Sequence, residues 1–185
     1  MRWTLLLIAL TAMAPARAGE LQVELGPVFQ KSTWAGDAGG GVHLRIGYRF
    51  VSFLAFDVGV GEALHATDLR LTTALSVGLT GSFRAGPLRP LLRLYFVHQH
   101  EEGLVSVRQS PFTAVVGIGD GIRHRAGGGL NAGVEIPLLS RPKWELFVAP
   151  TVTTTFIPDT SLGPAAYVGA SVGLGFNFPL ATEAR

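Results

Sequence analysis

The sequence predicts an all-β protein that folds as an eight-stranded antiparallel up-and-down transmembrane β-barrel. Three observations predict this fold. Apolar residues alternate with small or polar ones along eight segments, long and short connections alternate between those segments, and charged residues make up only 15% of the chain. Because successive side chains of a strand point to opposite faces, each segment has one apolar face and one small or polar face.

The alternating segments have roughly the 9–13 residues with which a tilted strand crosses a bilayer. They span residues 20–30, 41–50, 53–62, 69–81, 88–99, 128–137, 144–156 and 166–178. No segment repeats its apolar residues with the period of an amphipathic helix. The stretch 112–118, FTAVVGI, is apolar enough to form an extra strand or to pack over the lumen, so a ten-stranded barrel is the architectural alternative.

The connections between the segments alternate in length. Longer loops are expected at one end of the barrel, over residues 31–40, 63–68, 101–127 and 157–166. Mostly shorter turns are expected at the other end, and the charges around them are all basic: Arg84, Arg89, Arg141 and Lys143. This asymmetry, with both ends of the mature chain on the turn side, is typical of bacterial outer-membrane barrels.

The apolar face of each strand is expected to meet lipid. The chain has a mean hydropathy of +0.36, and its 15% of charged residues falls below the roughly 25–35% typical of a soluble surface. Aromatic residues on the apolar face gather near strand ends, where two membrane interfaces would place them. They are Tyr48, Phe50, Phe83, Trp144, Phe176 and Phe178 at the turn end, and Phe29, Phe96 and Phe156 at the loop end. The alternative is a secreted lipocalin-like binder whose leucines point inward.

The first eighteen residues, MRWTLLLIALTAMAPARA, have the features of a secretory signal peptide. Arg2 precedes a short apolar run, and small residues occupy the cleavage positions around Arg17. We expect cleavage near Ala18, a barrel over residues 19–178 and a short tail over 179–185. No later apolar run approaches the length of a transmembrane helix.

The charge balance and the absence of cysteine exclude several classes of function. Without Arg2 and Arg17 the chain has 13 basic and 13 acidic residues, so a nucleic-acid partner is not expected. With no cysteine, neither a disulfide framework nor a thiolate metal site can form.

The small and polar face of the strands also carries charges of both signs, and we expect these to point into the barrel. The set comprises Glu24, Arg45, Arg49, Asp57, Arg70, Arg93, Glu135 and Glu145. An isolated buried charge is very costly, whereas a paired one is tolerated. The interior of an eight-stranded barrel is just wide enough for its side chains. The sequence therefore predicts a largely plugged, charge-paired lumen.

The last strand, AYVGASVGLGFNF, and the layout of the whole chain resemble the small outer-membrane barrels typified by the OmpA membrane domain, OmpX and OmpW. In that group, the last strand ends in an aromatic residue preceded by apolar residues at every second position. The matching positions here are Leu174, Phe176 and Phe178. The resemblance implies that these residues are the signal read by the outer-membrane barrel assembly machinery. It also implies a location in the bacterial outer membrane among lipid and lipopolysaccharide, where we expect a monomer.

Polar residues that suit a divalent metal ion flank the longest loop. His98, His100 and Glu101 belong to HQHEE, and Asp120 and His124 belong to GIGDGIRHR. If the two flanking strands continue their pairing upward, these side chains converge. Imidazoles and a carboxylate suit zinc, which can activate water when one position is open. The other interpretation is that polar residues simply collect in solvated loops, with no cofactor.

No catalytic constellation emerges, so we expect a non-enzymatic barrel that acts in envelope structure or surface interaction through its loops. Ser106 or Ser110, with His98 or His124 and a carboxylate, would have the residue types of a lipid-cleaving triad. No serine and histidine lie close together on one strand, as they do in outer-membrane lipid A deacylases. Two alternatives remain. One is a narrow transport barrel for small or hydrophobic solutes, and the other is a metal-binding or metal-dependent lipid-modifying protein.

Overall fold

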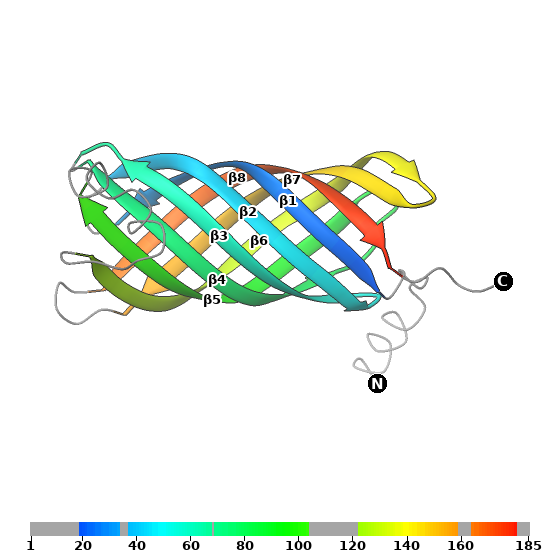
Figure 1. The fold of residues 1–185 in the computed structure, drawn as a ribbon, viewed down its shortest axis with the longest axis horizontal. Helices are drawn as coiled ribbons and strands as arrows, with labels where there is room; N and C mark the ends of the chain where they lie inside the picture. The colour runs from blue at the N-terminus through cyan, green and yellow to red at the C-terminus, as the bar shows by residue number, and fades with distance from the viewer. Residues whose placement is uncertain (1–18, 34–36, 68, 104–121, 159–163, 181–185) are drawn as a thin grey trace, which may run out of the picture.

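The computed structural model describes residues 19–33, 37–67, 69–103, 122–158 and 164–180. Within them the chain forms a closed barrel in which each strand pairs antiparallel with its sequence neighbours (Figure 1). The strands are β1 (Glu20–Ser32), β2 (Ala38–Val51), β3 (Leu54–His65), β4 (Arg70–Ser82), β5 (Arg89–Gly103), β6 (Arg123–Arg141), β7 (Trp144–Ile157) and β8 (Ala165–Pro179). The predicted eight-stranded antiparallel barrel is confirmed. In the part of the chain described, no helix is long and apolar enough to span a membrane.

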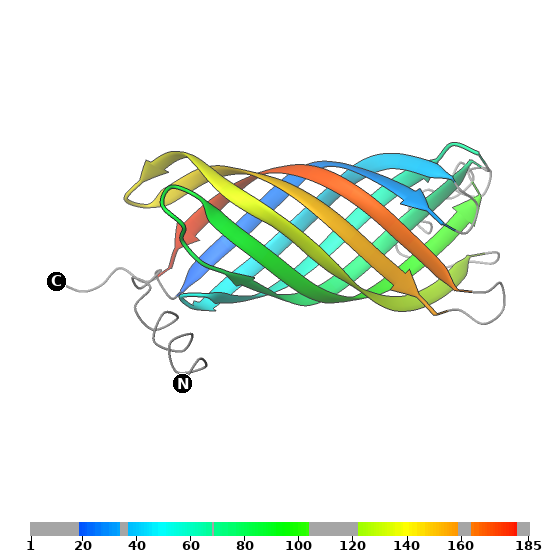
Figure 2. The ribbon, with the colours of Figure 1, turned by 180° about the vertical axis from the view of Figure 1, so that it is seen from behind.

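The barrel closes by pairing its first strand with its last. The register of β1 and β8 runs from Glu20 opposite Pro179 to Ser32 opposite Tyr167. Beside this seam, the N–H of Leu180 donates to the carbonyl of Gly19 at 2.6 Å. Both ends of the barrel wall therefore lie at the end that carries the short turns, and the strands run obliquely to the barrel axis (Figure 2).

Several strands extend beyond their predicted ends. At the loop end, β5 and β6 continue as a paired ribbon to Glu101 opposite Arg123. At the turn end, β6 continues through a register shift between Pro137 and Leu139 to Arg141, and the β6–β7 hairpin projects beyond its neighbours (Figure 1). Because β5 pairs directly with β6 in a closed ring of eight, the ten-stranded alternative is wrong. The segments 112–118, 1–18 and 181–185 lie outside the described residues.

The apolar side chains of each strand face outward, as β5 shows most clearly. Leu94 and Phe96 are 64% and 74% exposed, whereas Arg93 and Tyr95 between them are 9% and 7% exposed. The same alternation leaves a long series of leucine, valine and phenylalanine side chains on the outer surface of all eight strands. A water-soluble protein rarely exposes a continuous apolar surface of this kind. The alternative of a soluble binder with inward leucines is therefore wrong.

The inner face needs small residues where a large side chain crosses the narrow interior. Phe147 of β7 points inward and is fully buried. Its ring lies over Gly175 of β8, where an added Cβ would overlap the ring and lie 2.7 Å from the carbonyl oxygen of Val23. The glycines on the inward-facing side of β8 thus leave room inside the barrel for the bulky ring of Phe147.

Candidate functional site

All eight charged residues expected in the lumen lie inside the barrel, where they form three groups of ion pairs along its axis. The group at the turn end centres on Arg89 and Glu135, whose Nη1 and Oε2 atoms are 2.7 Å apart. The Nη2 of Arg89 also donates to Glu145 at 3.1 Å, and Arg49 donates to Glu20 at 3.2 Å. Arg89, Arg49 and Glu135 are each less than 5% exposed, so this group is buried inside the turn end of the barrel.

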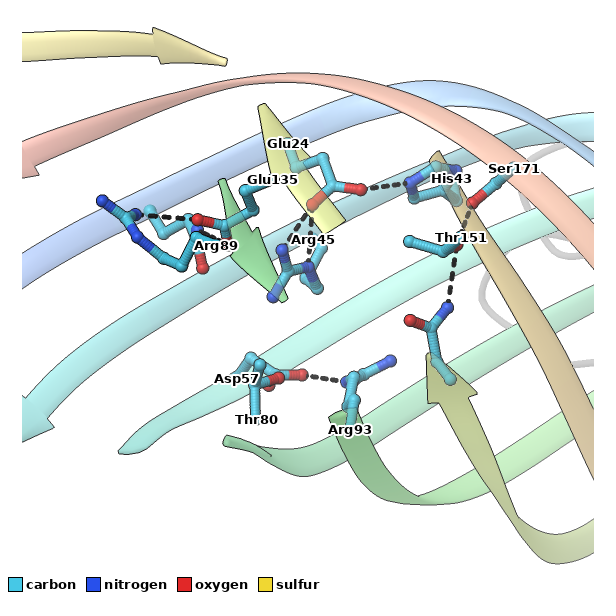
Figure 3. Close-up of polar contacts among 12 residues, drawn as sticks. Glu24, His43, Arg45, Asp57, Thr80, Arg89, Arg93, Glu135, Thr151 and Ser171 are labelled. Atoms are coloured by element: carbon cyan, nitrogen blue, oxygen red, sulfur yellow. Dashed lines mark hydrogen bonds and ion pairs between the residues drawn. The ribbon is translucent and has the colours of Figure 1, made fainter. Parts of the chain in front are cut away.

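The middle group joins β1 with β2, and β3 with β5 (Figure 3). Two guanidinium nitrogens of Arg45 donate to Glu24, and the Nε2 of His43 lies 3.1 Å from the other oxygen of that carboxylate. Separately, Arg93 pairs with the fully buried Asp57. Each anion therefore has a cation beside it, the condition under which buried charges are tolerated.

The loop-end group centres on Glu101. Its carboxylate accepts hydrogen bonds from Arg125 at 3.1 Å and from the hydroxyl of Tyr167 at 3.0 Å. Arg70 lies 3.6 Å from the same carboxylate and 3.8 Å from Asp37. Glu101, Arg125 and Tyr167 are each 3% exposed. This group therefore lies inside the barrel at the end opposite Arg89.

Asp37, in the connection between β1 and β2, contacts residues at the loop end of β3. Its Oδ1 accepts the backbone N–H of Thr67 at 3.0 Å, and its Oδ2 lies 3.4 Å from His65. Burial raises the pKa of Asp37, but hydrogen bonds from Thr67 and the positive charges of His65 and Arg70 outweigh it and lower the pKa below its ordinary value. A carboxyl whose folded pKa is lowered stabilises the fold at neutral pH and loses that contribution as the pH falls through the lowered pKa.

A cavity of about 140 Å³ lies inside the barrel, bordered by the middle group. Its walls carry hydroxyl and amide groups that bond to one another. Asn131 donates to Thr151 at 3.0 Å and Thr153 at 2.8 Å, and the hydroxyl oxygens of Thr151 and Ser171 are 2.7 Å apart. Tyr95 also lines the cavity, and its hydroxyl oxygen lies 2.6 Å from that of Thr155. A polar cavity of this size accommodates several water molecules.

Sequence reasoning missed several members of the lumen network. Arg89 was grouped with the basic charges around the short turns, but it is the first residue of β5 and points inward, as Arg93 four positions later does. Glu101 was expected as a metal ligand, but it lies on the lumen side of β5 with Arg125. Extending the alternation of β5 in both directions would have found both residues.

The structure brings together three of the five residues expected at a metal site. His98, His100 and His124 each offer a nitrogen, and these three nitrogens lie within 4.8 Å of one another. The Nε2 of His98 and the Nδ1 of His124 are 3.3 Å apart. Glu101 faces the lumen instead, because its odd-numbered position puts it on the opposite side of the wall from His98 and His100. Asp120 lies outside the described residues.

The three residues expected as an assembly signal lie on β8 at the turn end. Leu174 and Phe176 are 52% and 38% exposed on the outer surface. The ring of Phe176 stacks on that of Phe178 at a centroid distance of 5.9 Å, and Phe178 pairs in register with Leu21 of β1. These residues thus form an apolar strip beside the closing seam, in which Leu174 and Phe176 are exposed and Phe178 is half-buried.

Comparison with known proteins identifies the fold. Neither a protein-family model nor a curated sequence matches this chain. Among solved structures, it is similar to Neisserial surface protein A, with a TM-score of 0.57 and 15% identity over 87% of this chain and 96% of that one. It is also similar to OprG of Pseudomonas aeruginosa, with a TM-score of 0.55 and 13% identity over 90% and 99% of the two chains.

A computationally designed transmembrane β-barrel matches almost as well, with a TM-score of 0.50 and 16% identity over 89% of this chain and 99% of the design. At identities this low the likeness concerns the fold alone. The chain is thus an eight-stranded barrel of the type found in small outer-membrane proteins.

Proposed function

We propose that this protein is a small, non-enzymatic barrel of the bacterial outer membrane, exported through its signal peptide, that acts in envelope structure or surface interaction through its loops. The observation that carries this proposal is the set of ion pairs that cross the interior at the turn end, the middle and the loop end. We infer that these ion pairs, with the side chains around the polar cavity, leave no open path through the barrel. The barrel itself then serves as a membrane-embedded platform.

The outer surface supports the membrane location. On β5 the outward positions change from apolar to polar in one step, with Leu92, Leu94 and Phe96 followed by His98 and His100. An aromatic residue at such a boundary suits a membrane interface. The apolar strip of β8 supports recognition by the barrel assembly machinery during insertion, and lipid and lipopolysaccharide are the expected neighbours of the finished wall.

Single-channel recording on the detergent-folded protein, inserted into a planar bilayer, tests the closed lumen. We expect no stable conductance steps from protein whose folding has been verified by heat-modifiable gel migration. Recurrent steps of uniform size from the same preparation would overturn the proposal. Assays with phospholipid and lipopolysaccharide substrates test the non-enzymatic assignment, and hydrolysis at a rate proportional to protein concentration would contradict it.

A narrow transport barrel is the second candidate, and the polar cavity favours it. The cavity walls offer hydroxyl and amide groups that would accept a small polar solute. Transport would require the Arg89 and Glu101 groups to open in turn. Solute uptake by proteoliposomes that contain the protein, above the level of empty liposomes, would support this candidate over the structural one.

A further inference from the structure

We propose that His98, His100 and His124 form a zinc-binding site on the outer surface of the barrel wall, at its loop end. The site is separate from the lumen and does not depend on the proposed function. Three imidazoles from two adjacent strands supply the ligands, and the fourth position of a tetrahedral ion stays open to water, as in zinc sites with three protein ligands.

The strand register brings the three imidazoles together. His100 of β5 lies directly opposite His124 of β6, and residues paired in this way have Cβ atoms about 4.5–5.5 Å apart. His98 is two positions along β5 and points to the same side. The ring centroids of His98 and His124 both lie 4.8 Å from that of His100. The trio is therefore held by two paired strands of the barrel wall.

The spacing of the nitrogens fits a zinc ion. Zinc binds imidazole nitrogen at about 2.0–2.1 Å, so two nitrogens on a tetrahedral ion lie about 3.3–3.4 Å apart. The Nε2 of His98 and the Nδ1 of His124 are already 3.3 Å apart. The third nitrogen completes a set that spans no more than 4.8 Å. Side-chain rotations that bring the third nitrogen to about 3.4 Å from the other two would complete the set around one ion.

A second observation concerns His100, the central member. It is only 4% exposed, although it lies on the outer side of the wall. Its Nδ1 has no hydrogen-bond partner among the described residues. A buried polar nitrogen without a partner is costly, and a bound cation would satisfy it.

The cluster has no carboxylate among its own ligand atoms in the described part of the chain. Glu101, the nearest acidic residue in the sequence, is engaged with Arg125 and Tyr167 in the lumen. We therefore assign the zinc site to the three histidines without Glu101. The two histidines of HQHEE therefore bind zinc on the outer surface, while Glu101 of the same stretch stays in the lumen.

Calorimetric titration of zinc chloride into the detergent-folded protein, purified with a tag free of histidine, tests the site. We expect one zinc ion per chain with micromolar or tighter affinity. His100→Ala should weaken binding at least tenfold, and so should His98→Ala and His124→Ala, whose side chains are exposed and tolerate replacement even if His100→Ala does not fold. Binding should also weaken at pH 5.5, because a protonated imidazole offers no free nitrogen.

Two matched controls change residues on the inner side of the wall. Glu101→Gln and His43→Gln should both leave zinc affinity within about twofold of the parent. Absence of binding in the parent, or equal affinity in the parent and all three histidine variants, would overturn the proposal. Equal loss of binding in Glu101→Gln, with its folding verified by heat-modifiable migration, would overturn the assignment to the outer surface.

Discussion

Asp57 illustrates at the residue scale how the lumen holds charge. Its Oδ2 accepts the hydroxyl of Thr80 at 2.6 Å, and its Oδ1 pairs with the guanidinium of Arg93. Asp57 is 1% exposed and Arg93 is 9% exposed, so neither charge has bulk water as an alternative partner. Loss of one charge therefore leaves the other buried without compensation.

Replacement of that carboxylate alone should strongly destabilise the barrel. We expect Asp57→Asn to lower the free energy of unfolding by about 3 kcal/mol, the lower end of the range for breaking a buried ion pair. Urea unfolding of the detergent-folded protein, followed by gel migration, measures this change. The double variant Asp57→Asn with Arg93→Gln should recover most of the loss, since it removes the uncompensated charge. A double variant that loses the sum of both single losses would contradict the pairing.

At the scale of a strand, alternation explains both what could be predicted and what was missed. The apolar parity predicted all eight strands and the outward direction of residues such as Leu94, because period two follows directly from strand geometry. The stretch HQHEE was harder, since composition suggested one metal cluster. The strand divides it, with His98 and His100 on the outer side and Glu101 in the lumen. Composition alone did not show that β5 continues to Gly103.

The sequence did not predict which charged side chains pair with one another in the lumen. Which arginine meets which carboxylate depends on the stagger of the strands around the closed barrel, and the sequence does not specify this stagger. Arg89 of β5 reaches both Glu135 of β6 and Glu145 of β7, although these residues are far apart in the chain. The alternation of side chains along each strand predicts only that these charged residues point into the barrel.

The packing of β7 against β8 gives a prediction at this scale. A Cβ at Gly175 would overlap the ring of the buried Phe147 and crowd the carbonyl of Val23, so Gly175→Ala should cost about 1–3 kcal/mol, as overpacking does. Gly61 is the matched control, because a Cβ there would meet its nearest neighbour at 3.8 Å. Urea unfolding of both variants measures the difference. Equal stability of the two variants would show that the ring of Phe147 leaves room for a Cβ at Gly175.

The end of β8 gives another prediction for a strand. If the apolar strip is the assembly signal, Phe178→Ala should reduce insertion into the outer membrane of cells severalfold, measured as heat-modifiable protein in the membrane fraction. Folding of the purified variant in detergent should change little, because Phe178 lies on the outer side of the wall beside Leu21. Impaired folding in detergent to the same degree would assign Phe178 a structural role instead.

For the whole molecule, the fold follows from the difference between an apolar outer surface and a charged interior. The outer surface is apolar on all eight strands, and the charges of the interior lie in ion pairs and small networks. Lipid provides no hydrogen bonds, so a spanning sheet must close on itself, and β1 meets β8 to do so.

The direction of the side chains in a bilayer is therefore the central claim, and a spin-label scan of β5 tests it most directly. The chain has no cysteine, so single cysteines at Leu94, Phe96 and Val97 can each carry one nitroxide label. In lipid vesicles, labels at Leu94 and Phe96 should be relaxed strongly by oxygen dissolved in the lipid, and a label at Val97, 5% exposed inside the barrel, only weakly. Equal accessibility at all three positions, or the reverse order, would contradict the account.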